Sequence, residues 1–142
     1  MGGRDTEVSL VKFSQITNAK NKTFEAIEIL GEGWDSTLGG KAFDHVIVQI
    51  LVEEFNSMKE RKGMPDVREN ARAMKRLYKE TPKIKEVLSA NKIVDVKIPE
   101  LLDYVTLQFK LERTRFEEAS ESLFARVEDP ITQALTQAKL TA

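Results

Sequence analysis

Hydrophobic and polar residues alternate near the N-terminus, and this alternation predicts two β-strands joined by a turn. In Thr6–Ile16, the residues Val8, Leu10 and Phe13 stand among polar neighbours with one slip of register, as in a half-buried strand. The polar segment Asn18–Lys22 follows, is rich in turn-forming residues, and is succeeded by renewed alternation. The pattern therefore predicts a β-hairpin.

The spacing of apolar residues changes to three and four positions beyond Gly40, which predicts an amphipathic helix. Its single apolar stripe consists of Phe43, Val46, Ile47, Ile50, Leu51, Phe55 and Met58. We expect this helix to end near Gly63 and Pro65, because both residue types are poor helix formers.

A second helix is predicted from about Asp66 to Ala90, with Asn91 as its C-cap. Pro82 lies inside it and lacks the N–H group that would bond the carbonyl of Tyr78, so we expect a kink or an early break there. The apolar stripe of this helix consists of Ala71, Met74, Leu77, Tyr78, Thr81 and Leu88.

Alternation of period two returns after the second helix and predicts a second hairpin around Pro99–Tyr104. Thr114 and Glu117 then match a capping box, and Asp129-Pro130 matches an N-cap followed by proline at the first helical position. The order of elements, ββ-αα-ββ-αα, predicts an α+β fold in which helices pack on antiparallel strands.

Composition narrows the possible functions. The chain has 142 residues and a formal net charge of −1, which fits one domain and gives no support to a nucleic-acid or membrane-surface role. Cysteine is absent, which excludes disulfides, a thiolate nucleophile and a cysteine zinc site. No segment is long and apolar enough to span a bilayer, and no signal peptide is visible.

The glycine-rich segment Gly31–Lys41 runs directly into the first predicted helix, where exposed backbone N–H groups often bind phosphate. It does not match a P-loop, because Ala42 stands where a serine or threonine would be required. It does not match the dinucleotide pattern either, because Ser36 stands at the third glycine position. By motif alone, the segment is a flexible strand-to-helix turn, and anion binding stays open as the alternative.

Other candidate chemistry is sparse. His45 is the only histidine and has no H-x-x-x-H partner, so a surface or boundary position explains it better than a metal or catalytic role. Asp35 and Asp44 flank the glycine turn, and carboxylates at helix starts usually serve as caps or dipole partners. We therefore expect no catalytic and no metal-binding residue, since one histidine does not allow a credible Ser-His-Asp set.

The second predicted helix is basic, and this leaves a small nucleic-acid-binding module as a further hypothesis. Glutamates stand between its lysines and arginines, and its only aromatic residue, Tyr78, belongs to the apolar stripe. A solvated helix face is therefore the favoured interpretation, and nucleic acid is not expected as a partner.

The segment Leu38–Asp44 reads Leu-Gly-Gly-Lys-Ala-Phe-Asp and leads into the first predicted helix. Together with several other segments, it resembles the seventy-kilodalton heat-shock chaperone superfamily. In that family, Leu-Gly-Gly-x-x-Phe-Asp opens the first helix of the outer half of nucleotide-binding lobe II, and this chain has the same residues at Leu38–Asp44. The other matching segments follow in the same order along the chain, and they are Met1–Leu10, Glu69–Leu77, Lys83–Asn91, Leu111–Phe124 and Glu128–Leu140. The resemblance implies the outer half of lobe II of an actin-like ATPase fold.

Details of the sequence resemble the large, divergent members of that superfamily. Leu88–Asn91 and Val67–Met74 are similar to the large members, and the first hairpin is longer than usual through Phe13–Phe24. These features resemble the endoplasmic-reticulum hypoxia-up-regulated (170-kilodalton glucose-regulated) branch, with the cytosolic 110-kilodalton branch as the alternative. The implied location is the endoplasmic reticulum lumen, with the cytoplasm as the alternative.

The resemblance also implies nucleotide-contacting residues. Gly2 and Gly3 correspond to the second phosphate turn, and Lys85 and Ser89 correspond to positions that contact ribose and base. Gly39-Gly40 would form a strand-to-helix joint at the edge of the nucleotide cleft.

The chain departs from the family pattern at four positions close in sequence to these residues. Arg4 and Asp5 stand where a third glycine and a threonine are expected, and an aspartate beside a phosphate is unfavourable unless a cation intervenes. Pro82 replaces the glutamate of the adenosine helix, and Glu86 replaces the arginine that stacks on adenine. A carboxylate has the wrong sign for a cation–π interaction.

We therefore expect a fragment of an ATP-binding domain that is not catalytically competent alone and binds no cofactor tightly. Residues 1–38 would be a hairpin from the inner part of lobe II, 39–128 the outer subdomain, and 129–142 a return helix. The parent would be a molecular chaperone and nucleotide exchange factor that binds ATP or ADP with Mg²⁺, unfolded polypeptide and a conventional seventy-kilodalton chaperone. The alternative is an interaction module with a vestigial nucleotide cleft.

Overall fold

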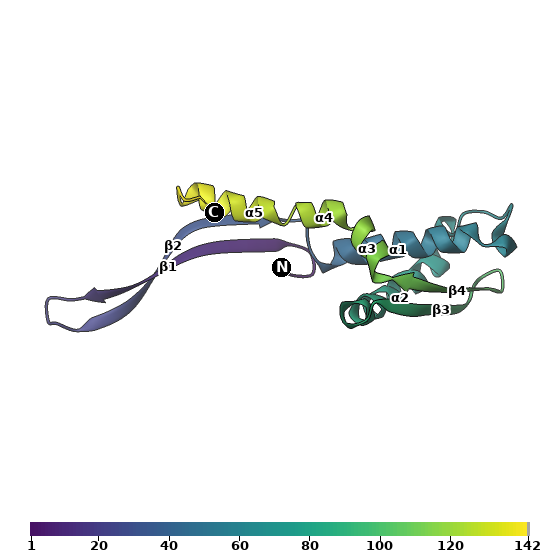
Figure 1. Ribbon diagram of the computed structural model, residues 1–142, viewed down its shortest axis with the longest axis horizontal. Coiled ribbons are helices and arrows are strands. Elements are labelled where there is room, and N and C mark those ends of the chain that lie inside the picture. The colour runs from purple at the N-terminus through teal and green to yellow at the C-terminus, as the bar shows by residue number, and fades with distance from the viewer. Residues whose placement is uncertain (142) are drawn as a thin grey trace. The chain divides into compact units, whose positions relative to one another are not determined.

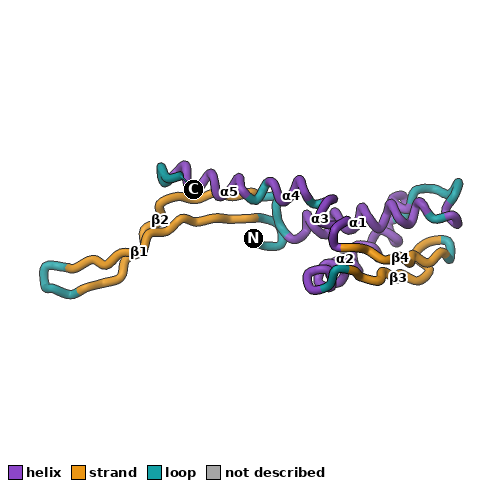
Figure 2. The backbone as a smooth tube through the Cα atoms, in the orientation of Figure 1, coloured by secondary structure: helices purple, strands orange, loops and turns teal. Residues whose placement is uncertain are grey.

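A computed structural model describes residues 1–141 and shows two antiparallel hairpins with packed helices (Figures 1 and 2). The α+β class predicted from the sequence is therefore confirmed. The elements are β1 (Thr6–Thr17), β2 (Thr23–Asp35), α1 (Gly40–Ser57), the 3₁₀ turns η1 (Lys59–Arg61) and η2 (Val67–Glu69), α2 (Ala71–Ala90), β3 (Ile93–Leu102), β4 (Val105–Glu112), α3 (Arg113–Ala119), α4 (Glu121–Ala125) and α5 (Glu128–Gln137).

The chain forms two compact units. The first unit contains residues 1–40 together with the segment that begins at Leu123, and the second contains Lys41–Ser122. The β1–β2 hairpin and α5 therefore belong to the first unit, and α2 with the β3–β4 hairpin to the second.

The β1–β2 hairpin has the slip of register that the alternation predicted. Pairing shifts by one residue between Leu10 and Val11, so β2 contributes an extra residue there. Val8 and Leu10 are half-buried as expected, but Phe13 is 73% exposed, which corrects the prediction for that residue. Phe13 lies beyond the bulge and pairs with Ile27, which is also exposed, so apolar alternation here does not mark a buried face.

Helix α5 lies along β2, and two glycines allow the close approach (Figure 1). A Cβ atom at Gly31 would overlap the carbonyl oxygen of Ala134, and one at Gly33 would overlap that of Pro130. Side chains of α5 then complete hydrogen bonds that β2 leaves open. The side-chain oxygen of Gln137 accepts from the Glu32 N–H at 2.7 Å.

The second unit has a single hydrophobic core. The stripe predicted for the first helix is confirmed, since Ile47, Leu51 and Phe55 have no exposed surface. These residues pack with buried residues of α2, β3 and β4, among which are Leu77, Leu88, Val96, Leu107 and Leu111. Burying side chains of this size stabilises a fold by roughly 1.5–3 kcal/mol each, so this core is the main source of stability in the unit.

Helix α2 begins later than predicted and does not break at Pro82. Asp66 caps the short turn η2 by accepting from the Arg68 N–H, and Asn70 then caps α2 by accepting from the Ala73 N–H at 2.9 Å. The helix runs unbroken from Ala71 to Ala90, so the early break is wrong. Buried residues on both sides of Pro82, among them Leu77, Thr81, Ile84 and Leu88, hold the helix together and outweigh the lost hydrogen bond.

Asn91 is confirmed as the C-cap of α2, because its N–H donates to the Val87 carbonyl at 2.8 Å. The capping box is wrong: α3 begins at Arg113, so Thr114 lies inside the helix, and Glu112 at the N-cap makes no side-chain capping bond. Arg113 fixes this junction instead, since its guanidinium donates to the carbonyls of Leu88 and Asn91.

The predicted start of the last helix is also corrected. Helix α5 begins at Glu128, so Asp129 is already helical and Pro130 is the third residue of the helix. The preceding residue, Val127, has helical dihedral angles (φ −63°, ψ −28°). The backbone therefore enters α5 from a helical residue, and no aspartate cap forms.

Gly33→Ala is expected to destabilise the first unit, because the added methyl would overlap the α5 backbone at Pro130 and force β2 and α5 apart. Overpacking of this kind costs roughly 1–3 kcal/mol in the free energy of unfolding, measured by chemical denaturation. Gly3→Ala is the control, because a Cβ atom there has nothing within 4 Å. Equal stability of the two variants would contradict the close approach of β2 and α5.

Candidate functional site

Three of the glycines predicted for the site lie together, and Gly3 belongs to the same turn. The Gly40 N–H donates to the carbonyl of Gly2 at 3.0 Å, which joins the first residue of α1 to the N-terminal turn. A Cβ atom at Gly39 would lie within 2.7 Å of backbone atoms of Arg4 and Asp5. Glycine at position 39 is therefore required for the close approach of these two segments.

The carboxylate of Asp35 holds the segment between β2 and α1 in place. It accepts from the backbone N–H of Thr37 at 2.9 Å and from that of Leu38 at 3.1 Å. The guanidinium of Arg126 donates to the same carboxylate, with a shortest distance of 2.7 Å. These bonds carry the chain from the end of β2 to Gly39, and Thr6 secures Leu38 through a 2.6 Å bond from its buried hydroxyl to the Leu38 carbonyl.

These donors change the acidity of Asp35. Hydrogen bonds from Arg126 and from the Thr37 N–H lower the pKa of Asp35 from 3.8 to about 2. Asp35 therefore carries its charge over the whole physiological pH range. Asp35 was expected to serve as a cap, and its carboxylate indeed caps the turn that leads into α1.

The predicted adenosine-side residues, Lys85 and Ser89, lie on α2, about one helical turn apart. The ammonium of Lys85 is 2.6 Å from a carboxylate oxygen of Asp44 on α1. The hydroxyl of Ser89 donates to the carbonyl of Glu86 in its own helix at 2.6 Å. Asp44 is thus an ion-pair partner, a role that its position in the sequence did not indicate.

The two sets of predicted residues belong to different compact units. Gly2, Gly3, Gly39 and Gly40 are in the first unit, and Lys85 and Ser89 are in the second. Each set is assembled by contacts within its own unit, as described above.

His45 is an exposed residue of α1 with a polar surface network. Its Nδ1 is 3.0 Å from the hydroxyl of Tyr78, and its Nε2 is 3.2 Å from the amide nitrogen of Gln49. Tyr78 is 45% exposed, which corrects its expected place in the apolar stripe. Among residues 1–141, no group of three or more His, Cys, Asp or Glu side chains is arranged to hold a metal ion.

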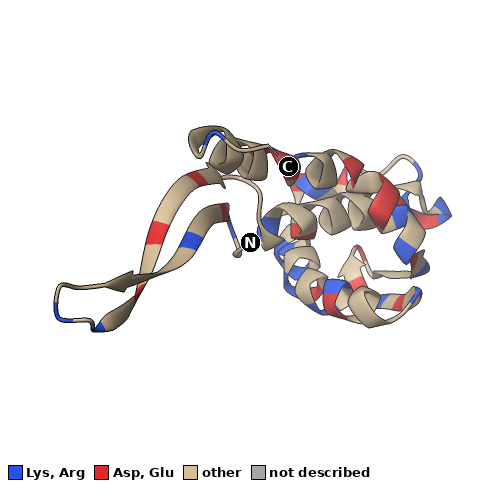
Figure 3. Ribbon diagram, turned by 60° about the vertical axis from the view of Figure 1, so that its left-hand side comes forward, with Lys and Arg blue, Asp and Glu red and all other residues tan. Residues whose placement is uncertain are grey.

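The distribution of charged and apolar residues does not point to a further binding site. Figure 3 shows acidic and basic positions interspersed along the helices of the second unit. Within the described part of the chain, no helix has the length and apolar character needed to cross a membrane.

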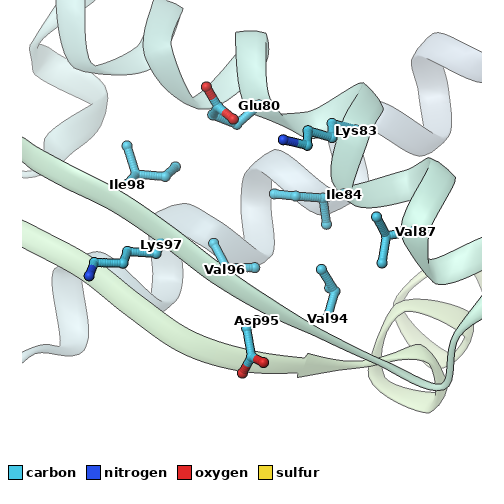
Figure 4. Close-up of a pocket in the computed structure, with 9 residues that line it drawn as sticks. All are labelled: Glu80, Lys83, Ile84, Val87, Val94, Asp95, Val96, Lys97 and Ile98. Carbon is cyan, nitrogen blue, oxygen red and sulfur yellow. The ribbon is translucent and has the colours of Figure 1, made fainter.

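A pocket of about 230 Å³ lies between α2 and β3 (Figure 4). Its aliphatic lining includes Ile84, Val94 and Val96, whereas Asp95 points away from the helix. Small-molecule sites usually have roughly 300–1,000 Å³ and a few converging polar groups. We therefore interpret this pocket as a packing gap at the edge of the second unit's core.

Comparisons with known proteins identify the family. Residues 1–142, the full length of the chain, match the family described as Hsp70 protein. The chain belongs to the Hsp70 family. This result confirms the resemblance inferred from Leu38–Asp44 and from the segments that match in the same order.

Individual relatives of this Hsp70-family chain include hypoxia up-regulated and heat shock proteins. Hypoxia up-regulated protein 1 of Danio rerio is 36% identical over 141 residues, and that of Xenopus laevis is 37% identical over 140, each over 99% of this chain. A heat shock protein homolog of Eremothecium gossypii is 39% identical over 115 residues, or 81% of the chain. The chain spans only 14%, 21% and 16% of these relatives, respectively.

Arg126→Gln is expected to raise the pKa of Asp35 from about 2 toward 3.8, because it removes the largest cause of the shift. A pKa that is lower in the folded state means that the folded protein binds fewer protons, so the stability is present above about pH 4 and is lost as the pH falls toward 2. The variant should therefore lose less stability over this window than the parent chain.

Carboxyl NMR titration of Asp35 and thermal unfolding between pH 2 and 5 would measure both effects. Arg115→Gln, which removes a different surface ion pair with Glu54, serves as the control and should leave the Asp35 titration unchanged. An Asp35 titration near 3.8 in the parent chain would contradict the network.

Proposed function

We propose that this chain is part of the ATP-binding domain of a heat-shock-type molecular chaperone and is not catalytically competent by itself. The observation that carries the proposal is the family match over residues 1–142, which includes the glycine joint at the start of α1. By the family resemblance, Gly2 and Gly3 would contact phosphate, and Lys85 and Ser89 would contact ribose and base. Each set would supply only part of the nucleotide contacts.

The residues present fit a nucleotide only in part. Lys85 lies on the surface of α2, one-third exposed, and its ion pair with Asp44 orients its ammonium. In the phosphate turn, the Gly2 N–H already donates to the Asp5 carbonyl at 2.7 Å. ATP or ADP with Mg²⁺ is therefore proposed as the cofactor of the longer protein, and tight binding to this segment alone is not expected.

The proposed parent would also bind unfolded polypeptide and act as nucleotide exchange factor for a conventional seventy-kilodalton chaperone. Support comes from the relatives, which include hypoxia up-regulated and heat-shock proteins. We propose the endoplasmic reticulum lumen as its location, because the long first hairpin resembles that branch, and the cytoplasm is the alternative.

A second candidate is an interaction module whose nucleotide cleft is vestigial. Pro82 and Glu86 favour it, because both are exposed on α2 and neither supplies the contact that the family pattern has there. Glu86 also places a negative charge on the face that would meet adenine, where the family has a cation.

Lys85→Ala is expected to weaken ADP binding to the full-length protein by roughly tenfold or more, because a charge-assisted hydrogen bond contributes about 1.5–3 kcal/mol. Titration calorimetry with ADP and ATP would measure the change. Lys83→Ala is the matched control, since Lys83 is exposed on the same helix and lines the unrelated α2–β3 pocket.

The outcomes separate the two candidates. Binding that weakens in the Lys85 variant and persists in the Lys83 variant supports the ATP-binding chaperone. No heat from the folded wild-type protein with either nucleotide would favour the interaction module.

The full-length protein is expected to accelerate ADP release from a conventional seventy-kilodalton chaperone at least severalfold, measured with a fluorescent ADP analogue in stopped-flow mixing. An exchange factor must bind the partner in a state that holds nucleotide weakly, since a protein shifts an equilibrium only by its differential affinity. Unchanged release at saturating concentration would remove the exchange function from the proposal.

A further inference from the structure

The turn ahead of β1 is closed upon itself by Asp5. The Gly2 N–H, which points at the ligand in a phosphate-binding turn, donates to the carbonyl of Asp5 at 2.7 Å. The side chain of Asp5 also folds over the turn, because a Cβ atom on Gly2 would lie 3.1 Å from its Oδ1. One donor of the turn is therefore engaged, and a carboxylate oxygen lies beside it.

The position of Asp5 is held by the backbone around it. Gly39 lies against the backbone of Arg4 and Asp5, and the Gly40 N–H donates to the Gly2 carbonyl. The next residue, Thr6, is buried, and its hydroxyl bonds the Leu38 carbonyl. The Asp5 backbone is thus held on both sides, and its Oδ1 lies beside Gly2.

We propose that Asp5 is a specificity-determining residue that selects against phosphate charge at this turn. The inference rests on the proposed nucleotide-binding function and adds a ligand preference to it: adenosine and ADP are favoured relative to ATP. The physical reason is repulsion between the carboxylate and the phosphates, which increases with each added phosphate. Arg4 next to it carries the opposite charge, which opposes this repulsion, so the test changes Asp5 alone.

Asp5→Asn tests this proposal in the full-length protein, because it removes the charge and keeps the shape. At low ionic strength, ATP affinity should rise about fivefold, the effect of one unit charge at roughly 4 Å in water. ADP affinity should rise less, and adenosine affinity should not change. The gain should shrink in about 1 M salt, where screening acts within roughly 3 Å.

Glu7→Gln is the matched control. Glu7 is exposed on β1 two residues away, so the substitution makes the same change in net charge without touching the turn. Titrations of adenosine, ADP and ATP, each with and without Mg²⁺, should show no graded gain in this variant.

Each outcome decides something different. The inference is supported if the gain in affinity rises from adenosine to ADP to ATP in the Asp5 variant and not in the Glu7 control. It is also supported if the Asp5 variant binds ATP and the wild-type protein does not. If the wild-type protein binds nucleotide and the Asp5 variant has the same ratio of ATP affinity to ADP affinity, the proposed function stands and the inference is overturned. Weaker MgATP binding in the variant also overturns it, because Asp5 would then hold the cation. No binding of any of the three ligands by either protein overturns both.

Discussion

Donors from two parts of the first unit, the turn after β2 and the segment ahead of α5, converge on the carboxylate of Asp35 and hold these parts together. The Thr37 and Leu38 N–H groups define the turn into α1, while Arg126 brings the segment ahead of α5 to the end of β2. Each donor favours the ionised carboxylate, and the low pKa of Asp35, about 2, is the measure of their combined effect. The glycine joint of the candidate site follows directly after this turn, so its geometry depends on this charged group together with the Thr6–Leu38 and Gly40–Gly2 hydrogen bonds.

The hydrogen-bond donors of the candidate nucleotide site are likewise already engaged within the protein. The Gly2 N–H, the Ser89 hydroxyl and the Lys85 ammonium already have protein partners at 2.6–2.7 Å. A ligand must therefore exchange partners instead of filling open ones, and the net gain of each exchange is small compared with that of a preorganised donor. This competition accounts physically for the weak nucleotide binding expected of the segment.

Both hairpins and the core-facing stripe of α1 could be predicted from the sequence, because apolar periodicity reports burial directly. Phe13 shows the limit of that reasoning, since an alternating strand gains a buried face only where another element covers it. Pro82 shows another, because buried neighbours on both sides outweigh one lost hydrogen bond. The ion pair between Asp44 and Lys85 could not be predicted. The residue pattern of one helix does not show which charged side chain of another helix will lie beside it.

The four departures from the family pattern share one physical property. Arg4, Asp5, Pro82 and Glu86 are all exposed, whereas the stripes that build the core are buried. Substitutions at exposed positions usually change stability by less than about 0.5 kcal/mol, so folding places little constraint on which residue stands there. Folding therefore does not account for these four residues, and two of them, Asp5 and Glu86, place negative charge where the family pattern has a neutral or a cationic side chain.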